Sequence, residues 1–200
     1  MGHNTVNLAA LIGSRICHDL ISPIGAINNG LELLGMTGAA ANEGPELDLI
    51  TESVDNASAR IRFFRVAYGA SSDQEIGRSE IVSVLNDVMR SSRLKVAWGP
   101  LDAQPRSMVR LAFLAIQCAE TAMPYGGRLE VTCTDGKWMI HGKADKLNID
   151  TALWRILDGA DAEDSLAPAH VQFALLPAVA QDENRTPATS IGDQDIKISF

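Results

Sequence analysis

The segment 15-RICHDLISPIGAINNGLELL-34 decides how the N-terminal part of the chain folds. Within and just before it, apolar residues recur at spacings of three and four, which is typical of a helix with one buried stripe. These residues are Leu8, Ile12, Ile16, Leu20, Ile24, Ile27, Leu31 and Leu34. Gly35 and Gly38 end the helix. The same helix contains His18, Asp19 and Pro23, and the direction in which His18 points limits what the segment can do.

A second helix is predicted over residues 46–70, where the apolar spacing alternates between three and four, as in a helical bundle. Its apolar positions are Leu47, Ile50, Val54, Ala57, Ile61, Phe64 and Tyr68. Two long helices with a short connection form an antiparallel hairpin. One partner helix cannot cover both stripes, so we expect residues 1–72 to form a homodimer whose two hairpins make a four-helix bundle. The alternative is that the rest of the chain covers the hairpin.

The pattern changes over residues 73–200 and becomes a mixture of helices and short strands. Helices are expected at 79–92, 105–124, 150–157 and 168–180, and strands at 93–99, 128–134, 137–143, 186–192 and 194–200. Asp135-Gly136 is a strong signal for a two-residue hairpin turn. The fold class is therefore α+β: a helical hairpin, then an α/β sandwich with helices on one face of a mixed sheet.

Composition excludes several classes of partner. The net charge of −8 argues against nucleic acid and against an anionic membrane surface. Cys17, Cys118 and Cys133 lack CxxC spacing, so a structural zinc site or a disulfide framework is not expected. No apolar run approaches the roughly 20 residues of a membrane span, and the first residues lack the pattern of a signal peptide. We expect a cytoplasmic protein without membrane attachment.

His18 points away from the buried stripe of its helix. At about 100° per residue, it lies about 200° from both Ile16 and Leu20. Its neighbours one turn away are Ser14, Arg15 and Ser22, with Gly25 and Asn29 beyond, and all of them are small or polar. We expect a flat, open approach that suits another macromolecule better than a small-molecule pocket. The alternative is an ordinary solvated surface histidine.

Two neighbours favour a functional histidine. Asp19 follows His18 directly, and a carboxylate near an imidazole can orient the ring and select the free nitrogen. Pro23 removes the amide that would bond to the carbonyl of Asp19, which is expected to bend the helix at a cost of about 3 kcal/mol. Strain held beside a titratable residue points to function, although a kink can also serve packing.

The segment His18-Asp19-Leu20-Ile21-Ser22-Pro23 resembles the H-box of sensor histidine kinases, in which a phosphoacceptor histidine precedes an acidic residue, a Ser or Thr and a Pro at these spacings. The longer string is similar to ChpT-type histidine phosphotransferases of alphaproteobacteria. The resemblance implies that His18 relays a phosphoryl group between receiver-domain aspartates in a two-component phosphorelay.

On this interpretation the partners are response-regulator receiver domains, including that of an upstream hybrid histidine kinase, and Mg²⁺ comes from the receiver. His18 is the phosphoacceptor and Asp19 orients or stabilises its imidazole. Arg15 is expected to neutralise the phosphoryl oxygens. Three small residues, Ser14, Ser22 and Gly25, let a receiver loop approach.

A kinase of this architecture would also carry an ATP-binding sandwich, and the sequence lacks its motifs. No Asn occurs between Arg110 and Val131, and Gln117 and Cys118 stand where a metal-binding Asn would be expected. Neither an Asp-x-Gly-x-Gly loop nor a glycine-rich phosphate loop follows. We therefore expect an ATP-binding-like domain without nucleotide motifs, no bound cofactor, and no ATP-dependent kinase activity of the chain's own.

Other candidate sites are weaker. His141 and His170 have no carboxylate or thiol at ligand spacing, so no metal site is expected. The tryptophans, Trp98, Trp138 and Trp154, are expected in the core or on a docking surface, not as a stacking platform. Two alternatives to the phosphotransferase stay open: a divergent ATP-dependent histidine kinase, and a dimeric interaction scaffold that does not use His18.

Overall fold

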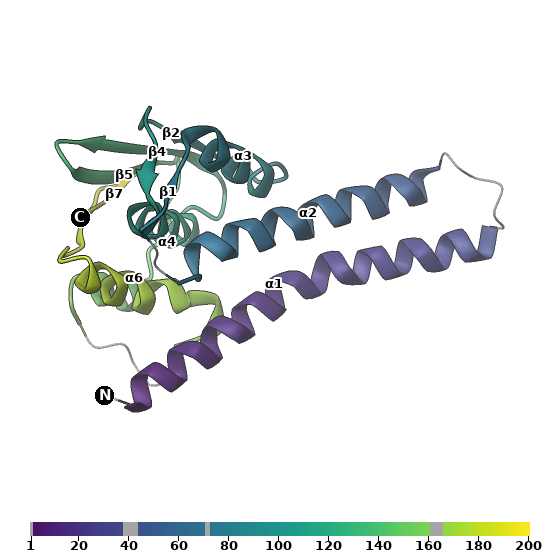
Figure 1. Ribbon diagram of the computed structural model, residues 1–200, viewed down its shortest axis with the longest axis horizontal. Helices are drawn as coiled ribbons and strands as arrows, with labels where there is room; N and C mark the ends of the chain where they lie inside the picture. The colour runs from purple at the N-terminus through teal and green to yellow at the C-terminus, as the bar shows by residue number, and fades with distance from the viewer. Residues whose placement is uncertain (1, 38–43, 71–72, 161–165) are drawn as a thin grey trace.

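The chain forms a long helical hairpin attached to a compact α/β unit, as the sequence predicts (Figure 1). The computed structural model describes residues 2–37, 44–70, 73–160 and 166–200. The hairpin consists of α1 (Gly2–Thr37) and α2 (Pro45–Ala67), which extend well beyond the α/β unit. Pro23 is buried inside α1, and the helix continues through it. Figure 1 shows α1 changing direction along its length.

The two hairpin helices approach closely but leave part of their apolar surface uncovered. A side chain at Gly30 would meet Cγ1 of Ile50 at 2.6 Å, so glycine is required where α1 crosses α2. Other positions of the predicted stripes lie open to solvent. The exposed fractions are 49% for Ile24, 54% for Leu31, 44% for Val54 and 49% for Ile61. The apolar stripes are therefore wider than the contact between the two helices.

The C-terminal half of α2 belongs to the core of the α/β unit. Phe63, Phe64 and Ala67 are buried in the same cluster as the sheet. The ring of Phe63 stacks on that of Phe113, with 4.7 Å between centroids. The predicted division at residue 72 therefore does not separate two independent hydrophobic cores.

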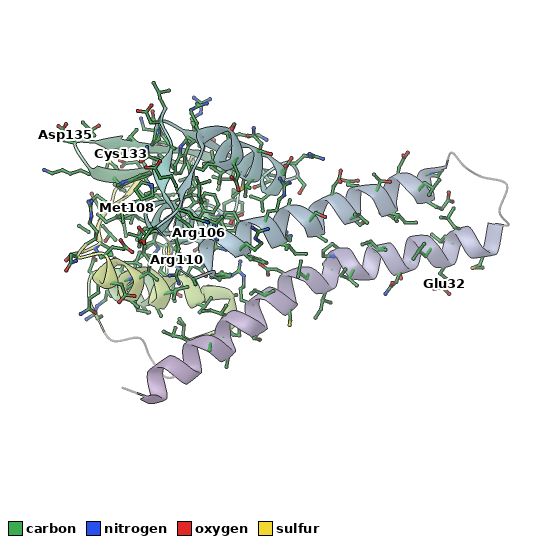
Figure 2. The ribbon with its side chains drawn as sticks, in the orientation of Figure 1. Glu32, Arg106, Met108, Arg110, Cys133 and Asp135 are labelled. Atoms are coloured by element: carbon green, nitrogen blue, oxygen red, sulfur yellow. The ribbon has the colours of Figure 1, made fainter. Side chains whose placement is uncertain are left out.

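Two arginines of α4 (Arg106–Ala122) cover the C-terminal end of α2. Arg106 donates a hydrogen bond of 2.6 Å to the carbonyl of Arg65, and Nε of Arg110 donates one of 3.3 Å to the carbonyl of Ala67. Cations here satisfy carbonyls that lack helical partners and complement the helix dipole. Figure 2 shows both side chains where α2 meets the α/β unit, while Glu32 stands far out on the hairpin.

The main sheet has five strands in the order β2-β4-β5-β7-β6. Their bounds are Leu94–Trp98 (β2), Gly127–Thr134 (β4), Lys137–Lys143 (β5), Ala188–Ile191 (β6) and Asp195–Ser199 (β7). β2 and β4 are parallel and the other pairs antiparallel, which confirms the expected mixed sheet. Asp135 and Gly136 join β4 to β5 with φ of 51° and 74°, which confirms the predicted turn. The two-residue strands Glu75–Ile76 (β1) and Gln104–Pro105 (β3) were not predicted, being too short to show periodicity.

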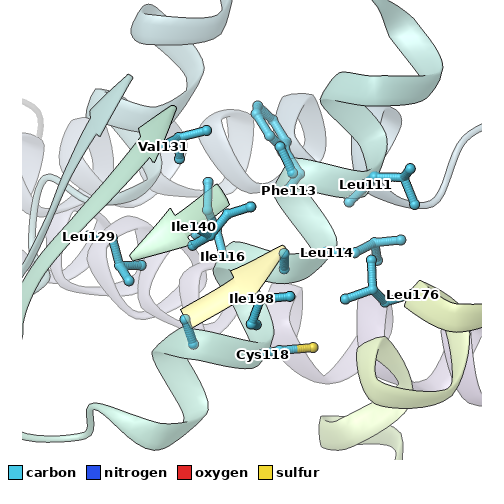
Figure 3. Packing of buried hydrophobic residues seen from close by; sticks show 14 of the residues in the cluster. Leu111, Phe113, Leu114, Ile116, Cys118, Leu129, Val131, Ile140, Leu176 and Ile198 are labelled. Atoms are coloured by element: carbon cyan, nitrogen blue, oxygen red, sulfur yellow. The ribbon is translucent and has the colours of Figure 1, made fainter. Parts of the chain in front are cut away.

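The remaining helices are α3 (Arg78–Val88), α5 (Thr151–Leu157) and α6 (Val171–Asp182), with the 3₁₀ turn η1 (Pro168–His170) before α6. α4 is the central helix, and residues 111–119 are all buried. Figure 3 shows its side chains between strand residues such as Ile140 and Ile198 and, on another side, Leu176 of α6. A helix covered on several sides has an apolar surface all round. As expected, Trp98, Trp138 and Trp154 are buried in this core.

Candidate functional site

His18 lies on the open surface of α1. Its side chain is 81% exposed, in agreement with the direction predicted from the helical spacing. Most of the ring is therefore open to solvent. Ser14 and Ser22, one turn away on either side, are also exposed. At Gly25 an added Cβ would meet nothing within 4 Å, so the space above this residue is open and no side chain projects into it.

The carboxylate of Asp19 contacts the imidazole of His18 and the guanidinium groups of two arginines. Its Oδ1 lies 3.1 Å from Nδ1 of His18, and its Oδ2 lies 2.8 Å from Nε of Arg15 and 3.7 Å from Nη1 of Arg60. The Asp19 side chain is only 11% exposed. A carboxylate accepts hydrogen bonds, so the neutral imidazole carries its proton on Nδ1. The free lone pair is then on Nε2, in a side chain that is 81% exposed.

Arg15 connects this site to the second half of the chain. Besides binding Asp19, its guanidinium donates a hydrogen bond to the carbonyl of Ala169 in η1. Arg15 is mostly buried, with 17% of its side chain exposed. The side chain therefore ties α1 to the α/β unit next to the contact between Asp19 and His18.

A groove of about 430 Å³ runs between α1 and α2 beside His18. The sequence predicts a flat, open surface around His18. That expectation is incomplete, because residues of α2 form the second side of a groove. The lining comes from His18, Asp19, Ser22, Pro23 and Ala26 on α1 and from Leu49, Glu52, Ser53, Asn56 and Arg60 on α2. Asn56 and Arg60 were not recognised from the sequence. They are four residues apart on one face of α2, but only the pairing of the helices places that face next to His18.

A second group of polar residues lies behind Asp19. Burial raises the pKa of Glu120 on α4, and the positive charges of Arg15 and Arg60 oppose that shift. Burial also raises the pKa of Tyr68, again against the charge of Arg15. Both groups therefore feel the positive charge that surrounds Asp19.

The position expected for a metal-binding Asn in a kinase is filled by packed side chains. Gln117 is buried, and its Oε1 accepts a hydrogen bond of 3.1 Å from the Tyr68 hydroxyl. Burial raises the pKa of the Cys118 thiol well above its usual range. The Gln117 amide therefore lies in the core, bound to Tyr68.

Within the described ranges, no group of three or more His, Cys, Asp and Glu residues is arranged to hold a metal ion. The structure does bring one unexpected pair together: Nε2 of His141 lies 3.2 Å from Oδ2 of Asp195. The sequence did not predict this contact because the residues are 54 positions apart and meet only through the pairing of β5 with β7. In the same described part of the chain, no helix is long and apolar enough to cross a membrane.

Comparison with known proteins gives consistent matches. The family model for the histidine phosphotransferase C-terminal domain matches residues 78–195, more than half of the chain. The protein phosphotransferase ChpT of Brucella abortus (strain 2308) is 36% identical over 184 residues, which cover 88% of this chain and 87% of that protein. A solved bacterial phosphotransferase aligns with a TM-score of 0.80 and 32% identity, over 97% of this chain and 95% of that one. A looser match, histidine kinase AdeS of Acinetobacter baumannii, has a TM-score of 0.44 and 11% identity, over 91% of this chain and 95% of that one. The chain therefore belongs to the histidine phosphotransferase family.

Proposed function

We propose that this protein relays a phosphoryl group between receiver-domain aspartates through His18, as part of a two-component phosphorelay. The observation that carries the proposal is the exposed imidazole whose Nδ1 is bound by the buried carboxylate of Asp19. A histidine held in this way presents one nucleophilic nitrogen without needing a cofactor of its own.

The reaction follows from this geometry. The Nε2 lone pair attacks the phosphorus of the receiver's aspartyl phosphate, and a P–N bond forms as the P–O bond to that aspartate breaks. The bonding electrons leave with the receiver's carboxylate. The proton on Nδ1 stays hydrogen-bonded to Asp19, whose charge stabilises the positive ring. In the second transfer an aspartate of another receiver attacks the same phosphorus and Nε2 leaves.

The proposed partners are response-regulator receiver domains, including that of an upstream hybrid histidine kinase, in the cytoplasm. The receiver supplies Mg²⁺. Ser14, Ser22 and Gly25 form the low surface around His18 against which a receiver loop packs. The predicted role of Arg15 in neutralising phosphoryl oxygens stays a prediction, and its bonds to Asp19 and Ala169 give it a positioning role as well.

We also propose that two copies of the chain pair through their hairpins. Ile24 and Leu31 are seven residues apart on α1, and Val54 and Ile61 are seven apart on α2, so each pair forms one exposed apolar stripe. A second hairpin would cover both stripes and complete a four-helix bundle. None of these four residues lines the groove beside His18, and the proposed pairing leaves that groove to the receiver.

Charged substitutions in these stripes are expected to separate the dimer. Each of Ile24→Glu and Val54→Glu would bury one unpaired carboxylate from each copy in the dimer interface. We therefore expect the dissociation constant of the dimer to rise by at least about 100-fold. Analytical sedimentation measures the mass of each protein in solution, and the wild-type dimer should have twice the 21.4 kDa of one chain. Leu101→Glu, at an exposed apolar residue outside the hairpin, is the control. A wild-type protein that sediments as a single chain would refute the dimer.

Asp19→Asn is expected to slow phosphoryl transfer by about 100-fold, because an amide stabilises the positive ring less and can present either of its groups to Nδ1. Transfer from a phosphorylated receiver is followed over time, and thermal unfolding checks that the fold persists. Glu32→Gln removes a carboxylate from an exposed position on the same helix and should transfer at the wild-type rate. Equal rates for all three proteins would remove Asp19 from the mechanism.

The proposal is tested by incubating the full chain with a phosphorylated receiver domain after nucleotide has been removed, and in parallel with Mg-ATP alone. We expect labelling from the receiver and none from ATP. Labelling from ATP alone would identify a kinase instead. No labelling from any of several receivers would favour the dimeric scaffold.

A further inference from the structure

We propose that Arg60 of α2 binds the phosphoryl group carried by His18, so that the second hairpin helix completes the site on the first. The inference rests on the proposed function and extends it by naming the group that meets the transferred charge.

Arg60 and His18 face the same groove and flank the same carboxylate. Nη1 of Arg60 lies 3.7 Å from Oδ2 of Asp19, and Nδ1 of His18 lies 3.1 Å from Oδ1. Among the described residues that line the groove, Arg60 is the only arginine or lysine. A phosphoryl group on His18 that turns toward the groove therefore meets this guanidinium.

The hydrogen bonds of Arg60 leave its terminal nitrogens suitable for this role. Its Nε donates to Oδ1 of Asn56 at 2.9 Å, which fixes the direction of the guanidinium. The 3.7 Å contact with Asp19 exceeds hydrogen-bond distance and is electrostatic only. Arg15 differs, since its Nε is 2.8 Å from Asp19 and it is also bound to the Ala169 carbonyl. Arg60 is also twice as exposed, at 36% against 17%.

The balance of charge around His18 also favours Arg60 as the residue that binds the phosphoryl group. A phosphoryl group brings roughly 1.5 to 2 negative charges at neutral pH, and here it arrives beside Asp19. Arg15 already forms a close ion pair with that carboxylate. The planar guanidinium of Arg60 can bind two phosphoryl oxygens through parallel hydrogen bonds, a geometry that a lysine cannot reproduce.

The test measures how the phosphoryl group partitions at equilibrium between a receiver domain and this protein, without nucleotide. We expect Arg60→Ala to lower the phosphorylated fraction of His18, relative to the receiver, by about tenfold. Arg60→Lys should recover part of this loss because the charge is retained. Arg62→Ala, which removes a cation of the same helix that pairs with Asp87 at 2.6 Å, should partition as the wild type does.

Repeating Arg60→Ala in an Asp19→Asn background separates direct binding from an effect through Asp19. Direct binding predicts a similar loss in both backgrounds. No further loss in the Asp19→Asn background, or no difference between Arg60→Ala and Arg62→Ala, would overturn the inference. Absence of labelling in the wild type would instead refute the proposed function, so the two failures are distinguishable.

Discussion

Replacing His18 with alanine is expected to abolish phosphoryl transfer and leave the stability of the protein almost unchanged. The imidazole is 81% exposed and its hydrogen bond is to its neighbour Asp19, so its removal leaves no cavity. Surface substitutions of this kind usually change the free energy of unfolding by less than about 0.5 kcal/mol. The proposed transfer, in contrast, depends on the imidazole of His18 as the nucleophile, so its rate should fall to background. Labelling from a phosphorylated receiver and a urea unfolding curve measure the two effects separately.

The chain offers a matched control for this experiment. His141 also lies close to a carboxylate, 3.2 Å from Asp195, but it is on the sheet and does not line the groove. His141→Ala should therefore be labelled like the wild type. Labelling that persists in His18→Ala would mean that another residue accepts the phosphoryl group. Partner binding that is unaffected by His18→Ala, without any labelling of the wild type, would favour the scaffold.

Phe113→Ala is expected to lower the free energy of unfolding by about 3–5 kcal/mol, the usual cost of deleting a buried phenyl ring. Phe113 is fully buried on α4, and its ring contacts Phe63 at 4.7 Å and Trp98 at 6.5 Å between centroids. Its loss would open a cavity between the hairpin and the sheet. Urea unfolding followed by tryptophan fluorescence and by circular dichroism measures the change.

The same experiment tests whether the hairpin base and the α/β unit unfold together. Because Phe63 of α2 shares a core with Phe113, both probes should shift to lower urea in Phe113→Ala. Met139→Ala, at a partly exposed strand position, should change the free energy of unfolding by less than about 0.5 kcal/mol. A fluorescence transition that shifts while the helical signal does not would show that the two parts unfold independently.

Much of the fold follows from local patterns. The three–four spacing predicts α1 and α2 because one turn of a helix repeats about every 3.6 residues, so a buried stripe appears directly in the sequence. Asp135-Gly136 predicts its turn because few residues tolerate positive φ at both positions. The order of the larger helices and strands after residue 73 was likewise predicted from local apolar periodicity and turn residues. Strands β1 and β3 were missed, since two residues carry no periodicity.

The sequence by itself determined the chemistry of one helix face. His18 and Asp19 are adjacent, and helical geometry alone turns His18 away from the apolar stripe. Tertiary structure decided what surrounds them: Arg60 and Asn56 reach the groove because α1 and α2 pack in one register, with Gly30 against Ile50. The contact of Arg15 with Ala169 likewise joins residues 154 positions apart. Local periodicity specifies which side of a helix a residue occupies, but the neighbour across that side depends on packing between elements distant in the chain.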